Sequence, residues 1–181
     1  VKDVVDFAKK NPKKLTISGA GLFVGHHIAN LQFDKAAGIK TKYIPAGGGV
    51  KAMQFVLGGQ TKAGFNNLSD AYRSRDRIKI LAVADLKRNE FLPNVPTLKE
   101  SGLDVDDSSV NFRGIMARKG IPQSELNFLA EKVPSMFQDK KVMKKMKDGG
   151  SPMRILKSSE VKKMWKERHA YLTDLLKDLK K

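Results

Sequence analysis

Short apolar runs alternate with segments in which apolar residues recur every three or four positions through the first 84 residues. The runs predict strands, and the helical spacing predicts the helices between them. The predicted strands are 15–18, 41–45, 63–65 and 78–84, and the predicted helices are 4–8, 28–36, 52–57 and a segment from about 69. Strands that alternate with crossover helices form a parallel-rich sheet with flanking helices, so the expected fold class is α/β.

The middle of the chain carries weaker signals. Pro93 and Pro96 indicate a stiff link, and Thr97 is placed to cap a short helix that ends before Gly102. Residues 110–117 are a further strand candidate.

Residues beyond Pro122 predict a C-terminal helical segment, with breaks at Gly149-Gly150 and Pro152. The last helix has the clearest pattern, with one apolar stripe and either Ser158 or Ser159 as its expected N-cap. The stripe consists of Val161, Met164, Trp165, Leu172, Leu175, Leu176 and Leu179. Such a stripe is expected to pack against another surface.

The chain is strongly basic, with 35 lysines and arginines against 19 acidic residues among 181 and a formal net charge of +16. Residues 139–181 alone contain 12 lysines and two arginines against six acidic residues. Nucleic-acid-binding patches usually add stacking aromatics or a known motif, and this end of the chain has only Phe137, Trp165 and Tyr171. Solvated helix faces explain the charge, so no nucleic-acid partner is expected. A basic nucleic-acid-binding module remains the alternative function.

Cysteine is absent, which excludes a disulfide framework, a thiol nucleophile and a cysteine-ligated zinc site. No apolar run approaches the 18 residues of a transmembrane helix, and no secretory signal is visible at Val1.

Three loops follow predicted strands, at 19–25, 45–50 and 65–67, and the first two are rich in glycine. In open α/β sheets, ligands bind outside the carboxyl ends of the strands, where free N–H groups at helix starts attract anions. Each loop alone is explained by a tight turn. Together on one edge, the three loops predict an anion pocket of backbone donors and neutral amides.

A dinucleotide site is the competing interpretation of the first loop. The G-x-G-x-x-G spacing is not met, because the third glycine is Gly25, one place late. The second strand ends Lys42-Tyr43-Ile44-Pro45 without the acidic residue that would bind a ribose. A nucleotide-dependent enzyme is therefore the less favoured alternative, and no cofactor is expected.

His26 and His27 suggest a metal ligand or a general base, but adjacent helical residues point in different directions and cannot share one ion. Neither an H-E-x-x-H motif nor a cysteine supports a metal site. His27 is expected to pack or to brace the loop. A triad from Ser18, His27 and Asp70 lacks a nucleophile-elbow pattern, so no catalytic residue and no metal site are predicted.

Motifs along the whole chain resemble a known family. The matching stretches are KLT at 14–16, the glycine loop ending His26-His27, AAG at 36–38, Pro45 with the following glycines, LGGQ at 57–60, Phe65-x-Asn67-Leu68, LAV at 81–83, Arg88, LPNVPTLKESG at 92–102, FRG at 112–114 and GIP at 120–122. The run from Arg88 to Gly102 is the most specific of these. The chain resembles the extracytoplasmic solute-binding receptors of tripartite tricarboxylate transporters, the Bug-type receptors.

The resemblance implies a type II periplasmic-binding-protein-like fold of the Venus-flytrap kind and a periplasmic or extracytoplasmic location. It further implies a non-enzymatic receptor that captures a small di- or tricarboxylate or related metabolite and delivers it to the transporter's membrane subunits. The ligand-binding candidates carried over by position are Gly19, Ala20, Gly21, Phe23, Val24, Ala46, Gly47, Gly48, Asn66, Asn67, Phe112 and Arg113.

Several of these positions depart from the family pattern. Serines common in the family are replaced by Gly19, Ala20 and Val24, a glycine by Phe23, an aspartate by Asn66 and a tyrosine by Ala46. Hydroxyl donors are lost and an aromatic ring is added, which suggests a ligand that is larger, less charged or more apolar.

The resemblance also implies a further stretch of roughly one domain before Val1. On that basis residues 1–107 correspond to the second lobe and 108–181 to a segment returning to the first lobe, with a hinge near 104–111. The apolar stripe of the last helix would then lack its usual sheet. We therefore expect a partial chain or a homodimer through the C-terminal helix.

Overall fold

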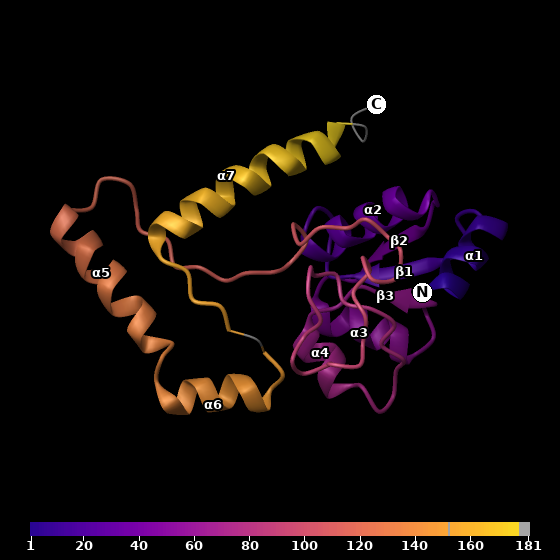
Figure 1. The fold of residues 1–181 in the computed structure, drawn as a ribbon, viewed down its shortest axis with the longest axis horizontal. Coiled ribbons are helices and arrows are strands. Elements are labelled where there is room, and N and C mark those ends of the chain that lie inside the picture. Colours follow the sequence, from indigo (N-terminus) through magenta and orange to yellow (C-terminus); the bar gives the residue numbers. More distant parts are fainter. Residues whose placement is uncertain (152, 178–181) are drawn as a thin grey trace. The chain divides into compact units, whose positions relative to one another are not determined.

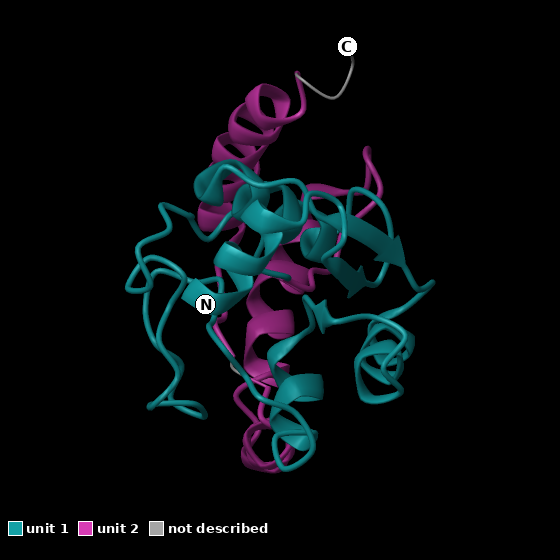
Figure 2. Ribbon diagram, turned by 90° about the vertical axis from the view of Figure 1, so that its right-hand side faces the viewer, with its two compact units in different colours: residues 1–111 teal, residues 112–181 magenta. Residues whose placement is uncertain are grey.

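The computed structural model describes residues 1–151 and 153–177. They form two compact units, Val1–Asn111 and Phe112–Lys181 (Figure 2). Pro152, predicted as a helix break, and Leu179, predicted in the apolar stripe, lie outside the described residues.

Unit 1 contains a parallel sheet of three strands in the order β2-β1-β3. The strands are β1 (Thr16–Gly19), β2 (Lys42–Pro45) and β3 (Ala63–Gly64), which confirms three of the four strands predicted before residue 84. The helices are α1 (Lys2–Lys10), α2 (Gly25–Ala37), α3 (Gly49–Leu57) and α4 (Leu68–Arg73). The connection from β1 to β2 leads toward one edge of the sheet, and the connection from β2 to β3 leads back across β1 to the other edge. Because both connections are right-handed, α2 and α3 lie on opposite faces of the sheet (Figure 1).

The hydrophobic core of unit 1 contains residues of α1, of α2 and of the sheet face that α2 covers. Ile17 of β1 and Phe33 of α2 belong to one buried cluster, in which Phe33 also meets the Phe65 ring edge-on. The remaining buried members are Val5, Ala8, Leu15, Ala37, Ile39, Leu98, Leu103 and Val105. Gly38 ends α2 in the left-handed conformation (φ 63°), as its position after the last periodic residue predicts.

A pair of buried hydroxyl groups links the opposite face of the sheet to α3. Ser18 is fully buried and donates to the backbone oxygen of Ala52 in α3 at 2.9 Å, while Thr61 donates to the Ser18 Oγ at 3.1 Å. Because both hydroxyls are satisfied, this polar contact fixes α3 against β1 without leaving an unpaired group.

The predicted strand at 78–84 is wrong. Val83 alone forms an isolated parallel bridge, to Thr97, and the segment is only half buried. Thr97 does cap the following segment, with Thr97 N–H donating to the Glu100 carboxylate at 2.7 Å and Glu100 N–H donating to Thr97 Oγ1 at 2.9 Å. The capped segment is a turn and not the predicted helix, because Gly102 (φ 85°) reverses the chain within one turn.

The predicted strand at 110–117 is also wrong, since the described residues offer this segment no neighbouring strand and residues 111–117 are exposed. Apolar residues without a pairing edge do not form a strand, because the ladder hydrogen bonds require a partner.

Unit 2 consists of α5 (Gln123–Met136), α6 (Lys140–Asp148) and α7 (Ser158–Leu175). Within these three helices, all of them described, no residue is buried. Neither Ser158 nor Ser159 caps α7. The N-cap is Lys157, whose N–H donates to the Glu160 carboxylate at 2.8 Å. The apolar stripe of α7 is therefore without a core in this unit.

Candidate functional site

The loops after β1, β2 and β3 lie at the carboxyl edge of the sheet (Figure 1). The order β2-β1-β3 places a topological switch point between β1 and β3, where crossover connections leave in opposite directions. Backbone bonds join the loops, with Ala46 N–H donating to Gly19 O at 2.8 Å and Phe65 N–H to Ser18 O at 2.9 Å. The structure thus brings together the predicted site residues of unit 1.

His26 connects the first loop to the third across this point. Its Nδ1 accepts the Ala20 N–H at 3.0 Å, and its Nε2 lies 3.2 Å from Asn67 Oδ1. Since Nδ1 is an acceptor, the proton sits on Nε2 and is donated to Asn67. Burial lowers the pKa of His26, although the bond to Asn67 and the charge of Asp70 oppose that shift. His26 is therefore a neutral brace between two loops.

His27 braces the same loop at a second point, as predicted. Its Nδ1 accepts the Phe23 N–H at 3.0 Å, and its ring lies 5.2 Å from the Phe23 ring and 4.5 Å from the Tyr43 ring between centroids. Phe23 takes a positive φ of 57°, a conformation that costs energy for a residue with a side chain. The two histidines thus hold separate points of one loop.

Tyr43 completes this bracing and was not found by sequence reasoning. Its hydroxyl donates to Gly21 O at 2.9 Å, and burial raises its pKa to about 12. A Cβ on Gly19 would lie 2.7 Å from the Tyr43 Cζ, so only glycine fits beneath the ring. One signal in the sequence pointed to this contact. The alternation of side chains along β2 places Tyr43 on the same face as Pro45, the residue that pairs with Gly19.

The surface of the first loop is apolar. Leu22, Phe23 and Val24 are 57%, 59% and 44% exposed, and Val50, which follows the second glycine loop, is 64% exposed. The groups that the first two loops offer a ligand are accordingly backbone N–H groups and apolar side chains.

The second loop leads into α3 through Gly47 (φ 80°) and the N-cap Gly48. A Cβ at Gly49 would lie 3.3 Å from Asp70 Oδ2 and 3.1 Å from Asn67 Nδ2. Asp70 is bound by Arg73 at 2.7 Å. The start of α3, where the helix dipole attracts anions, therefore already faces a carboxylate of the chain itself, which sequence reasoning missed.

The two asparagines of the third loop differ. Asn67 Oδ1 accepts from Asn111 Nδ2 at 2.6 Å as well as from His26. Asn66 Oδ1 is buried and has no hydrogen-bond partner among the described residues. Asn67 is thus committed to the frame of the site, whereas Asn66 retains a free acceptor. No local sequence signal identified Asn111.

Phe112 and Arg113, the remaining predicted site residues, belong to unit 2. Phe112 packs edge-on against Trp165 of α7 with 5.9 Å between centroids, and the Arg168 guanidinium lies 5.1 Å from the Phe112 ring. Arg113 is exposed.

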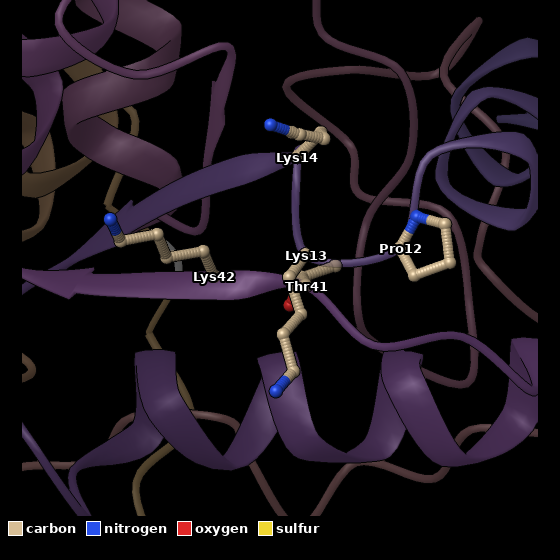
Figure 3. A pocket seen from close by; sticks show the side chains of 5 residues that line it. All are labelled: Pro12, Lys13, Lys14, Thr41 and Lys42. Atoms are coloured by element: carbon tan, nitrogen blue, oxygen red, sulfur yellow. The ribbon is translucent and has the colours of Figure 1, made fainter.

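A hollow of about 440 Å³ lies away from these loops, where β1 and β2 begin (Figure 3). It is lined by Pro12, Lys13, Lys14, Thr41 and Lys42. The lysine side chains point in different directions from its walls (Figure 3). In the part of the chain that the structure describes, no group of three His, Asp or Glu side chains is placed to hold a metal ion, and no helix is long and apolar enough to cross a membrane.

A family model described as "Tripartite tricarboxylate transporter family receptor" matches residues 1–180. The chain belongs to this receptor family. The resemblance inferred from the sequence motifs is thereby confirmed. A curated Cupriavidus necator protein, "UPF0065 protein in gbd 5'region", is 30% identical over 121 residues, which cover 66% of this chain and 36% of that relative.

Two solved structures share the fold. A protein described as a periplasmic transporter has a TM-score of 0.84 at 26% identity, with 97% of this chain and 59% of that chain covered. An R. palustris protein solved with adipate has a TM-score of 0.80 at 19% identity, with 98% and 60% covered. The expected α/β periplasmic-binding-protein-like fold is confirmed, and the chain spans well under two thirds of the length of these relatives.

Acidification is expected to destabilise unit 1, because burial lowers the pKa of both His26 and His27 from the ordinary value of 6.5. Between the folded-state pKa and 6.5 the unfolded chain binds more protons than the folded chain. The contribution of the two histidines to the free energy of unfolding is therefore fully present above pH 6.5. It is lost as the pH falls through the folded-state pKa. Urea unfolding followed by circular dichroism at pH 7.5, 6.5 and 5.5 measures this slope.

His26→Asn is the matched control for this pH dependence. The asparagine amide oxygen can replace Nδ1 as acceptor for Ala20 N–H but does not titrate. Below pH 6.5, the slope of the free energy of unfolding against pH is expected to decrease by the equivalent of at most about one bound proton. A slope identical to that of the unaltered chain would contradict the role assigned to His26.

Proposed function

We propose that the chain forms part of an extracytoplasmic receptor that captures a small organic acid and delivers it to the membrane subunits of a tripartite tricarboxylate transporter. The observation that carries this proposal is the receptor-family match over residues 1–180. The fold shared with a protein solved with adipate supports a di- or tricarboxylate or a related metabolite as ligand. The protein acts by binding and not as an enzyme, in the periplasm or an equivalent extracytoplasmic space.

The proposed contacts on unit 1 lie at the carboxyl edge of the sheet. They are supplied by Gly19, Ala20, Gly21, Phe23, Val24, Ala46, Gly47 and Gly48, with the amides of Asn66 and Asn67. The start of α2 makes such an edge favourable for an anion. Ala20, Phe23 and Ala46 contribute through the shape of the loops, because their N–H groups are already bound by His26, His27 and the Gly19 oxygen, respectively.

The lobe assignment is part of the proposal. Residues 1–107 form the second lobe, residues 108–181 return to the first, and closure about 104–111 brings Phe112 and Arg113 to the ligand. The apolar stripe of α7 is covered either by further chain of that lobe or by a second copy in a homodimer.

Isothermal titration calorimetry of the intact protein with a panel of mono-, di- and tricarboxylates tests this function. Saturable binding is expected, and Gly48→Leu is expected to weaken it by about tenfold or more. A Cβ at Gly48 meets no atom within 4 Å, so this substitution adds bulk at the edge without disturbing the fold. Gln54→Leu, at an exposed position in the second half of α3, is expected to leave affinity unchanged. Absence of heat with every carboxylate would refute the proposal.

A further inference from the structure

Four exposed apolar side chains, which we call the apolar rim, border the candidate site: Leu22, Phe23, Val24 and Val50. Single exposed apolar residues are common on protein surfaces, but a contiguous apolar run at a binding edge indicates a contact surface. Phe23 is also held in place. Its φ is positive, its N–H is bound by His27, and its ring meets the His27 ring edge-on. A strained and braced aromatic ring that remains exposed is positioned to contact something other than its own chain.

A fixed negative charge lies beside this rim. The side chain of Asp70 is only 12% exposed and is held by Arg73 at 2.7 Å and by Asn67 Nδ2 at 3.3 Å. Its carboxylate lies at Gly49, where α3 begins. A ligand carboxylate placed at the start of α3 would therefore meet a like charge in a partly desolvated position, which is unfavourable.

The remaining charges at this edge can balance one carboxylate. Arg73 pairs with Oδ1 of Asp70, whereas Oδ2 lies toward Gly49 at the start of α3. His26 and His27 accept backbone N–H groups at Nδ1 and are neutral in that arrangement. Residues 20–25 and 46–52 contain a single cation, Lys51, and no hydroxyl side chain. A second carboxylate would find neither a cation nor a hydroxyl donor in these two loops.

We propose, building on the receptor function above, that the ligand is a monocarboxylate with an apolar body. Its carboxylate lies at the loop N–H groups, its alkyl or aryl body lies against the apolar rim, and Asp70 rejects ligands with a second carboxylate. Phe23 and Asp70 are thus the specificity-determining residues of the site.

Hexanoate and adipate provide the decisive comparison, because they have the same six-carbon chain and differ only in whether the far end is a methyl or a carboxylate group. Calorimetry of the intact protein is expected to show hexanoate binding about tenfold or more tightly than adipate. Phe23→Ser is expected to weaken hexanoate by about tenfold and to change adipate much less, because it removes apolar contact area. Asp70→Asn is expected to strengthen adipate several-fold and to leave hexanoate nearly unchanged.

Asp148→Asn is the matched control, since Asp148 is an exposed carboxylate that also pairs with a cation, Lys144, at 2.6 Å. It makes the same change of charge and is expected to alter neither affinity. Thermal unfolding by circular dichroism verifies that each variant is folded. If Asp70→Asn does not fold, Val50→Ser takes its place beside Phe23→Ser, with a selective loss of hexanoate affinity expected.

The outcomes separate the two proposals. Tighter binding of adipate than of hexanoate by the unaltered protein would overturn this inference and leave the receptor function intact. Hexanamide bound as tightly as hexanoate would overturn it as well, because the carboxylate would then be unrecognised. No binding of any carboxylate would refute the receptor function itself.

Discussion

Replacing Gly25 with alanine is expected to lower the free energy of unfolding by about 2 to 3 kcal/mol. A Cβ at this position would lie 2.6 Å from the backbone oxygen of Ser109 and 2.7 Å from Asn111 Oδ1. A backbone oxygen cannot rotate away as a flexible side chain can, so the segment at 109–111 must shift. The shift would also loosen the bond from Asn111 to Asn67 at the candidate site. Urea unfolding of the variant measures the loss.

The sign of this effect discriminates between two explanations. Gly25 is the first residue of α2, and helix propensity alone would make alanine stabilising by up to about 1 kcal/mol. Gly21→Ala is the matched control, because its Cβ would meet nothing nearer than Val24 Cγ2 at 3.9 Å. We expect that control to stay within about 0.5 kcal/mol of the unaltered chain. A stabilised Gly25→Ala variant would show that the contact with Ser109 is not close in solution.

Phe33→Ala is expected to have the largest effect on stability, a loss of about 3 to 5 kcal/mol in the free energy of unfolding. Phe33 is 5% exposed, belongs to the core cluster of unit 1, and meets Phe65 with 6.0 Å between ring centroids. Truncation removes apolar burial and leaves a cavity between α2 and the sheet. Urea unfolding followed by circular dichroism measures the change, with loss of cooperative unfolding as the extreme outcome.

Phe128→Ala makes the same chemical change on α5, where Phe128 is 60% exposed. Its expected effect is below about 1 kcal/mol, because little apolar area is removed from contact. Equal losses from the two variants would contradict the description of unit 2 as a set of helices without a buried core. They would instead indicate that α5 is covered in solution, as by a second copy of the chain.

Local signals were sufficient for the centre of unit 1. Each of β1, β2 and β3 is a short apolar run followed by a loop and a helix, and parallel strands with right-handed crossovers leave little freedom in how they are arranged. The carboxyl-edge location of the loops followed from the same rule. The run at 78–84 failed because a strand is defined by its neighbour, and only the pair Val83 and Thr97 meets that condition.

The sequence by itself determined the α/β pattern, the glycine loops, the absence of hydroxyl side chains in the first of them and the membership of a receptor family. These are properties of residue type and spacing along the chain. Only the tertiary structure decided that His26 and His27 brace separate points of one loop, that Tyr43 covers Gly19 and that the Asp70 carboxylate lies beside Gly49 at the start of α3. The bond from His26 to Asn67 joins residues 41 positions apart, so such contacts depend on how side chains fill space and not on local periodicity.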